Sequence, residues 1–245
     1  MQRERLALVL LLMSVFMINY PLVNSFLEDS FQNPNVGFVE RVVDGDTAII
    51  SNHSVRFLGI NSPEKGEIGH DAAMDFLKSK IEKKNVTLVF GKDRMDLYGR
   101  ELAYVFFNNE NVNLESVKLG YSNVYFPNGK DPYYGNFADA WQDCLEKGMN
   151  LCNRSNDTCL SVEKWDTRNQ VVILKNTCNY DLNITGWSVK DEGRKNYRFS
   201  DKSLLAGEEV SLVPSDWGKD YVWTETGDSI FVRDNFGKLV YWNTY

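Results

Sequence analysis

Two short segments carry the side chains that could do chemistry. The first is Val42-Val43-Asp44-Gly45-Asp46-Thr47, in which Asp44-Gly45 is by itself an ordinary tight-turn dipeptide. The second begins at Arg56, continues through an apolar stretch, and ends in the turn Asn61-Ser62-Pro63-Glu64. If the two segments fold against each other, their oxygen atoms converge, and oxygen ligands suit a hard divalent cation.

A third segment supplies a second arginine. Asp96-Leu97-Tyr98-Gly99-Arg100 precedes another β-rich run, Glu101 to Phe107, so that Arg100 lies at the mouth of a strand. Two planar guanidinium groups beside a carboxylate-bound cation are what a phosphoryl group needs. The three segments together predict phosphoryl chemistry.

These motifs, in this order, resemble the staphylococcal-type thermonuclease family. The likeness covers residues 36–152 and extends to Tyr121–Pro127 and to the helix exit Gly148-Met149-Asn150-Leu151. It implies an endonuclease that hydrolyses phosphodiester bonds in DNA or RNA. It also implies Ca²⁺ as the cofactor, bound by Asp46 and the Ser62 carbonyl, with Asn61 where the family often has aspartate.

The same resemblance assigns the catalytic roles. It implies that Glu64 holds the attacking water as general base, and that Arg56 and Arg100 grip the phosphate and neutralise its transition-state charge. It further implies that Tyr98 and Tyr125 line the nucleotide pocket.

The elements that must position these residues are short strands with one inserted helix. A helix is expected from His70 to Lys84, with its apolar residues on one face, and two more from Leu114 to Leu119 and from Tyr133 to Lys147. The expected strands are Phe38–Val43, Thr47–Ser51, Val55–Ile60, Val86–Phe90 and Glu101–Phe107. Five strands with an inserted helix predict a small Greek-key barrel of the oligonucleotide-binding type, the fold that the resemblance also implies.

Residues 159–245 read as strand and turn throughout and predict a β-sandwich. The spacing of Leu182–Trp187, Leu205–Val213 and Asp234–Gly237 resembles the lamin-tail domain, an immunoglobulin-like sandwich. Because the stretch Asn153–Thr158 is polar and aperiodic, we expect it to be a linker between two separable domains.

The four cysteines predict two disulfides if the protein is exported. Cys159 lies seven residues before the turn signal Asp166–Asn169 and Cys178 lies nine residues after it, so we expect a hairpin around this turn to set them opposite each other. Cys144–Cys152 then follows by elimination.

The N-terminus indicates export. Arg3 and Arg5 precede the apolar run Leu6–Ile18, which is short for a membrane span and suits a signal peptide over residues 1–25. Because apolar residues resume at Tyr20–Val23, an uncleaved anchor is the alternative. We therefore expect a secreted protein or one anchored on the outer side of a membrane.

The net charge of −7 argues against binding to nucleic acid by counterion release alone. Two other kinds of function also stay open. One is a catalytically weak nucleic-acid-binding barrel, and the other is an envelope-interaction protein that acts through its C-terminal domain. Asn61 is the feature that favours loss of catalysis. The sequence leaves open the oligomeric state, the choice between DNA and RNA, and any surface partner of the C-terminal domain.

Overall fold

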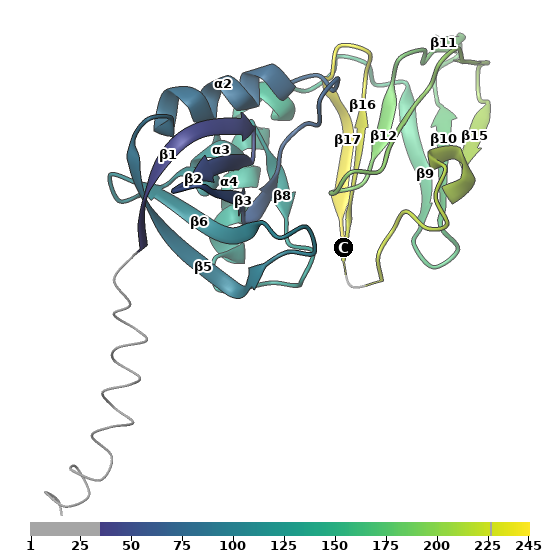
Figure 1. Ribbon diagram of the computed structural model, residues 1–245. Helices are drawn as coiled ribbons and strands as arrows, with labels where there is room; N and C mark the ends of the chain where they lie inside the picture. Colours follow the sequence, from purple (N-terminus) through teal and green to yellow (C-terminus); the bar gives the residue numbers. More distant parts are fainter. Residues whose placement is uncertain (1–34, 226) are drawn as a thin grey trace, which may run out of the picture. The chain divides into compact units, whose positions relative to one another are not determined.

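The computed structural model describes residues 35–225 and 227–245, and Val36–Tyr245 form one compact unit (Figure 1). The predicted signal or anchor over residues 1–25 lies outside the described residues. Among the described helices, none combines the length and the apolar character that crossing a membrane requires.

A closed five-stranded barrel of the oligonucleotide-binding type forms the N-terminal part. Its sheet has the order β3-β2-β1-β5-β6, with a short β7 beside β6, and a parallel pairing of β3 with β6 closes the barrel. A separate pair joins β4 to β8. The strands are β1 (Asn35–Asp44), β2 (Thr47–Ile50), β3 (His53–Phe57), β4 (Gly59–Asn61), β5 (Asn85–Met95), β6 (Glu101–Phe107), β7 (Glu110–Asn111) and β8 (Asn123–Tyr125).

The expected strand Val55–Ile60 is two strands in the structure, because the chain turns sharply after Leu58. The Leu58 N–H donates to the Ala103 carbonyl at 3.0 Å, and Gly59 has a φ of +76° that favours glycine. The turn sends β4 away from the barrel sheet to pair with β8. Asn61 therefore lies at the end of a strand distinct from the one that carries Arg56.

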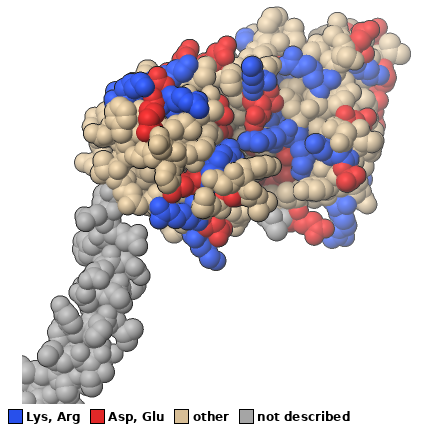
Figure 2. Space-filling model, in the orientation of Figure 1, with Lys and Arg blue, Asp and Glu red and all other residues tan. Residues whose placement is uncertain are grey.

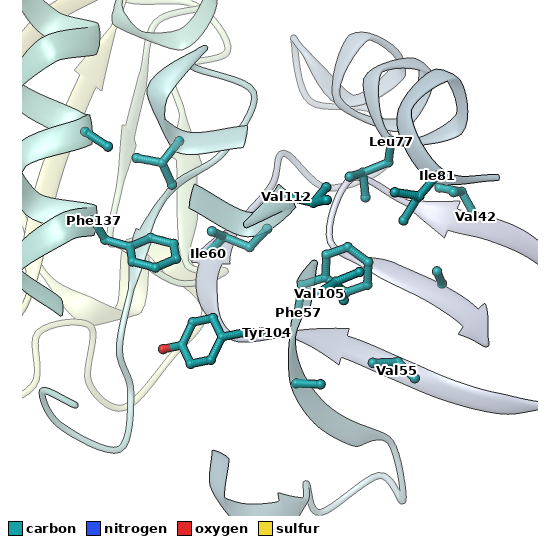
Figure 3. Packing of buried hydrophobic residues seen from close by; sticks show 14 of the residues in the cluster. Val42, Val55, Phe57, Ile60, Leu77, Ile81, Tyr104, Val105, Val112 and Phe137 are labelled. Carbon is teal, nitrogen blue, oxygen red and sulfur yellow. The ribbon is translucent and has the colours of Figure 1, made fainter. Parts of the chain in front are cut away.

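Three helices pack on the barrel: α2 (His70–Ile81), α3 (Val112–Lys118) and α4 (Tyr134–Lys147). The helix expected from His70 to Lys84 ends earlier, since Lys83 adopts a φ of +60°. Helix α2 buries Leu77 and Ile81 against the barrel, where they meet side chains of the strands and of α3 (Figure 3). This core includes Phe57 and Ile60, so it packs the strands that carry Arg56 and Asn61 against the helices.

The C-terminal part consists of antiparallel sheets that enclose a second hydrophobic core. The sheets have the orders β15-β10-β9, β11-β14 and β13-β12-β16-β17. Their strands are β9 (Leu160–Asp166), β10 (Val171–Asn176), β11 (Leu182–Asn183), β12 (Ser188–Lys190), β13 (Asn196–Arg198), β14 (Ser203–Leu204), β15 (Glu209–Leu212), β16 (Ser229–Arg233) and β17 (Leu239–Thr244). The likeness of this part to the lamin-tail domain stays a prediction.

The disulfides join the pairs that the sequence predicts, Cys144–Cys152 and Cys159–Cys178. The β9–β10 hairpin begins in the expected register, with Val171 opposite Asp166, and an irregularity between Ile173 and Leu174 shifts the partners by one residue. Because the shift occurs before the hairpin reaches its cysteines, Cys159 pairs with Thr177 and is not directly opposite Cys178 as expected. The two cysteine Cα atoms still lie 5.1 Å apart, which is within the range of a disulfide.

The expected linker is in contact with the last strand. The Leu239 N–H donates to the Asn153 carbonyl at 2.7 Å, and the Ser155 N–H donates to the Leu239 carbonyl at 2.9 Å. On α4, Trp141 is 2% exposed and packs edge-to-face against Phe231 and Trp242. The barrel and the C-terminal sheets therefore share buried surface, and whether either part folds alone stays a prediction.

Candidate active site

The turn between β1 and β2 brings the first acidic segment against helix α2. A Cβ atom at Gly45 would lie 2.6 Å from the Cβ atoms of Ala73 and Ser62, a separation that side chains do not adopt. Glycine at this position therefore lets the Asp44–Asp46 turn approach the Ser62 turn closely.

Asp46, Arg56 and Ser62 meet in the interior. An oxygen of the Asp46 carboxylate lies 3.1 Å from Arg56 Nη2 and accepts the Ser62 N–H at 2.9 Å. The other oxygen accepts the Thr47 hydroxyl at 3.0 Å. All four residues are buried, so the predicted convergence of the two segments is present in the structure.

The Arg56 side chain is held on several sides. Its Nη1 donates to the Phe57 carbonyl at 2.5 Å, and its Nη2 donates to the Ile60 carbonyl at 2.8 Å and to Asn61 Oδ1 at 3.4 Å. These contacts fix the guanidinium plane. An ion pair on the protein surface would not need these additional hydrogen bonds.

The environment of Asp46 sets its charge state. Burial alone would raise the pKa of Asp46, but Arg56, the Ser62 N–H and the Thr47 hydroxyl outweigh burial and lower the pKa. Burial raises the pKa of Asp44, and the neighbouring Asp46 carboxylate adds to that effect. The turn thus favours the charged form of Asp46 more than that of Asp44.

Asn61 faces two directions. Its Oδ1 points to Arg56, and its Nδ2 donates to the main-chain carbonyls of Glu192 at 3.2 Å and Gly193 at 2.8 Å. Across the β4–β8 pair, Asn123 also donates its Nδ2 to the Glu192 carbonyl, at 3.0 Å. A turn of the C-terminal part, Asp191–Lys195, therefore lies directly against the candidate site.

Glu64, the predicted general base, is paired with that same turn. Its carboxylate lies 2.8 Å from Arg194 Nε, and both side chains are partly exposed. Nearby, the Glu67 carboxylate contacts Lys190 Nζ at 2.5 Å and accepts the Asn196 amide at 2.8 Å. Burial alone would raise the pKa of Glu67, and Lys190 with the surrounding hydrogen bonds lowers it instead.

Arg100 makes its contacts within its own turn. Its Nε donates to the Asp96 carboxylate at 2.7 Å, and its Cζ lies 5.6 Å from the centre of the Tyr98 ring. Tyr98 itself is 79% exposed. The parallel pairing of Arg56 with Leu102 nevertheless places the start of β6 beside the strand that carries Arg56.

Tyr125 lies opposite Gly59 in the β4–β8 pair, two residues from Asn123, the partner of Asn61. Burial raises its pKa, while Arg56 acts in the opposite direction. The tyrosine lines a cavity of about 1190 Å³, whose wall also includes residues 191–195. Of the site residues predicted from the sequence, Tyr125 alone lines this cavity and Tyr98 does not, so the nucleotide pocket stays a prediction.

The predicted metal ligands remain predictions. Within the residues that the structure describes, no group of three or more His, Cys, Asp or Glu side chains could hold a metal ion. The predicted set contains one carboxylate, Asp46, together with an amide and a main-chain oxygen. The roles predicted for Glu64, Arg56, Arg100, Tyr98 and Tyr125 are likewise expectations that contacts alone do not test.

Sequence reasoning missed the residues that the C-terminal part brings to the site: Lys190, Glu192, Gly193, Arg194 and Asn196. The one local signal is a charged turn with a central glycine, Asp191-Glu192-Gly193-Arg194, between two strands. On the face shown in Figure 2, basic and acidic side chains are interspersed.

Comparisons with known proteins identify the family to which the barrel is similar. The family model described as "Staphylococcal nuclease homologue" matches residues 54–153. A thermonuclease from Staphylococcus intermedius is 31% identical over 126 residues, which cover 47% of this chain and 75% of the relative. An uncharacterised endonuclease of Haemophilus influenzae is 33% identical over 136 residues, covering 53% of this chain and 73% of the relative. The chain therefore belongs to the family of staphylococcal nuclease homologues.

Proposed function

We propose that this protein is a Ca²⁺-dependent endonuclease that hydrolyses phosphodiester bonds in DNA or RNA outside the cytoplasm. The observation that carries the proposal is the buried Asp46–Arg56 pair, packed on the Ser62 turn within a nuclease-family barrel. Two disulfides support an extracytoplasmic location, because disulfides persist in oxidising compartments.

The donor set at the site fits a hard cation. Asp46, the Asn61 Oδ1 and the Ser62 carbonyl are oxygen donors of three kinds, and Ca²⁺ accepts carboxylate, amide and main-chain oxygens. The Asn61 amide nitrogen is turned toward carbonyl oxygens of another segment, so its oxygen faces the site. These three residues would hold the ion, which when bound polarises the phosphoryl oxygens.

The chain's own residues then divide the remaining work. Glu64 accepts a proton from the attacking water, and its partly exposed carboxylate is accessible to solvent. Arg56, held rigidly by main-chain carbonyls, presents its guanidinium to the charge that develops on the phosphate. Arg100 exchanges its contact with Asp96 for the phosphate, and Tyr98 and Tyr125 border the nucleotide.

A second candidate, a catalytically weak nucleic-acid-binding protein, is favoured by two observations. Arg194 forms an ion pair with a carboxylate oxygen of Glu64, and the Asn61 side chain supplies no negative charge. The test compares single-stranded DNA, duplex DNA and RNA as substrates with Ca²⁺, Mg²⁺ or chelator. Ca²⁺-dependent cleavage that is lost in Glu64→Gln supports the nuclease. A gel shift without cleavage supports the nucleic-acid-binding protein. If the protein shows no cleavage and no gel shift, both candidates are refuted.

A further inference from the structure

The turn Asp191–Lys195 is built into the candidate active site by buried hydrogen bonds. Asn61 is 1% exposed and donates to the carbonyls of Glu192 and Gly193, while Asn123 is 8% exposed and donates to the Glu192 carbonyl. If the turn moved away, these buried amides would be left without hydrogen-bond acceptors, which is unfavourable. The turn is therefore held at this place.

The contacts also orient Asn61. Two carbonyl oxygens need a donor, so the side chain must turn its Nδ2 toward the C-terminal turn. Its Oδ1 is then directed to the opposite side, 3.4 Å from Arg56 Nη2. An aspartate at this position would face two carbonyl oxygens, which gives a physical reason for asparagine here.

The same turn reaches the predicted base. Arg194 Nε lies 2.8 Å from a Glu64 oxygen. On either side of Arg194, Lys190 and Asn196 bind the Glu67 carboxylate, and a Glu67 oxygen accepts the Glu64 N–H at 3.0 Å. Both the side chain and the main chain of Glu64 thus depend on residues 190–196.

We propose that the turn Asp191–Lys195 is a positioning element of the nuclease site: the carbonyls of Glu192 and Gly193 orient Asn61, and Arg194 orients Glu64. This inference rests on the proposed function. It makes the C-terminal part a component of the active site and not only a module for binding partners. Arg194 acts through Glu64, so it is a positioning residue.

The first test uses the full chain with Arg194→Ala, Arg194→Lys and the control Arg198→Ala, an exposed arginine of the adjacent strand β13. We expect Arg194→Ala to lower kcat about fivefold to tenfold with KM within twofold, because a misplaced base slows chemistry more than binding. Lysine should restore part of the rate, and Arg198→Ala should match the wild type. In a Glu64→Gln background, Arg194→Ala should change the residual rate no further.

The second test measures hydrogen exchange and does not depend on enzymatic activity. A Cβ at Gly193 would lie 3.3 Å from an Asp191 carboxylate oxygen and 3.6 Å from the Tyr125 ring. Because Gly193 is buried, the γ-methyl groups of Gly193→Val have to enter this contact and perturb the turn where its carbonyl meets Asn61. We expect hydrogen exchange of residues 59–64 to speed up at least threefold in this variant, while that of β9 and β10 stays unchanged.

Each result decides the question. The positioning role is overturned if the cleavage rate of Arg194→Ala is unchanged or higher than that of the wild type. It is also overturned if Arg194→Ala lowers the rate equally in the Glu64→Gln background. A higher rate would show that the turn blocks the site. Unchanged exchange at residues 59–64 in Gly193→Val overturns the orientation of Asn61. If the wild type cleaves no nucleic acid while the exchange result holds, the proposed function fails and the structural role of the turn survives.

Discussion

Arg56 Nη2 lies 3.1 Å from the Asp46 carboxylate, and both side chains are more than nine-tenths buried. Breaking a buried ion pair by removing one partner costs about 3–5 kcal/mol, because the remaining charge is left without compensation. The pair therefore contributes to stability as well as to the proposed chemistry. For variants at Arg56, both the free energy of unfolding and the turnover rate must be measured.

Replacing each arginine by lysine separates these two contributions. Arg56→Lys and Arg100→Lys should each lower turnover about tenfold or more, because lysine lacks the bidentate fork. Only Arg56→Lys should also lower the free energy of unfolding, by about 1–3 kcal/mol, since it loses bonds to the buried carbonyls of Phe57 and Ile60. Urea denaturation and initial rates measure the two effects. Near-wild-type rates in both variants would remove their assigned role.

Asn61→Asp tests the metal site and the contact with the C-terminal turn together. For the wild type, we expect a half-saturating Ca²⁺ concentration of roughly 10⁻⁴–10⁻³ M. The added carboxylate of the variant should lower this concentration. Without Ca²⁺, the variant should melt at a lower temperature, because the carboxylate faces the Glu192 and Gly193 carbonyls. Melting scans and activity titrations against Ca²⁺ give both numbers. A half-saturating concentration that stays the same or rises would show that Asn61 is not a ligand.

The acidic group beside the site predicts a pH dependence of stability. Burial, with smaller contributions from Asp228 and Asp191, raises the pKa of Glu192 from its ordinary 4.5 to about 8. Between these values the folded chain binds more protons than the unfolded chain, so stability falls as the pH rises from about 4.5 to 8. Glu192→Gln should flatten this decline and stabilise the protein at pH 8 by on the order of 1 kcal/mol or more.

The control for this measurement is Glu146→Gln, at an exposed position on α4. Urea denaturation at several pH values between 4.5 and 8 compares the three proteins. Parallel curves for Glu192→Gln and the wild type would contradict the raised pKa. Some slope should remain in the variant, since burial also raises the pKa of Asp191 to about 6.

The surface shared by the barrel and the C-terminal sheets predicts that a fragment ending near Asn153 is weakened. It would expose Trp141, which packs on Phe231 and Trp242. In the full chain, Phe231→Ala should cost about 3–5 kcal/mol, as for other buried aromatic truncations. Chemical denaturation measures both proteins, and a fragment as stable and as active on short oligonucleotides as the full chain would support separable domains instead.

The sequence by itself determined the local parts of the site. The Asp44-Gly45-Asp46 turn, the strand that carries Arg56 and the Asn61–Glu64 turn each depend on neighbouring residues. The structure brings the segments together through Asp46, Arg56, Asn61 and Ser62, whereas Glu64 pairs with Arg194. The pairing of Cys159 with Cys178 also follows from a single hairpin. Local periodicity and turn chemistry carry this information because the interacting groups are close in the chain.

The tertiary structure alone decided what surrounds that site. The strand expected over Val55–Ile60 is divided, because the chain turns at Gly59 and β4 pairs with the distant strand β8. The amide of Asn61 meets the carbonyl of Gly193, which lies 132 residues further along the chain, and Arg194 meets Glu64. Such contacts join main-chain oxygens and single side chains of unrelated segments, so they leave no periodic pattern, and they form only when the packed cores bring the two surfaces together.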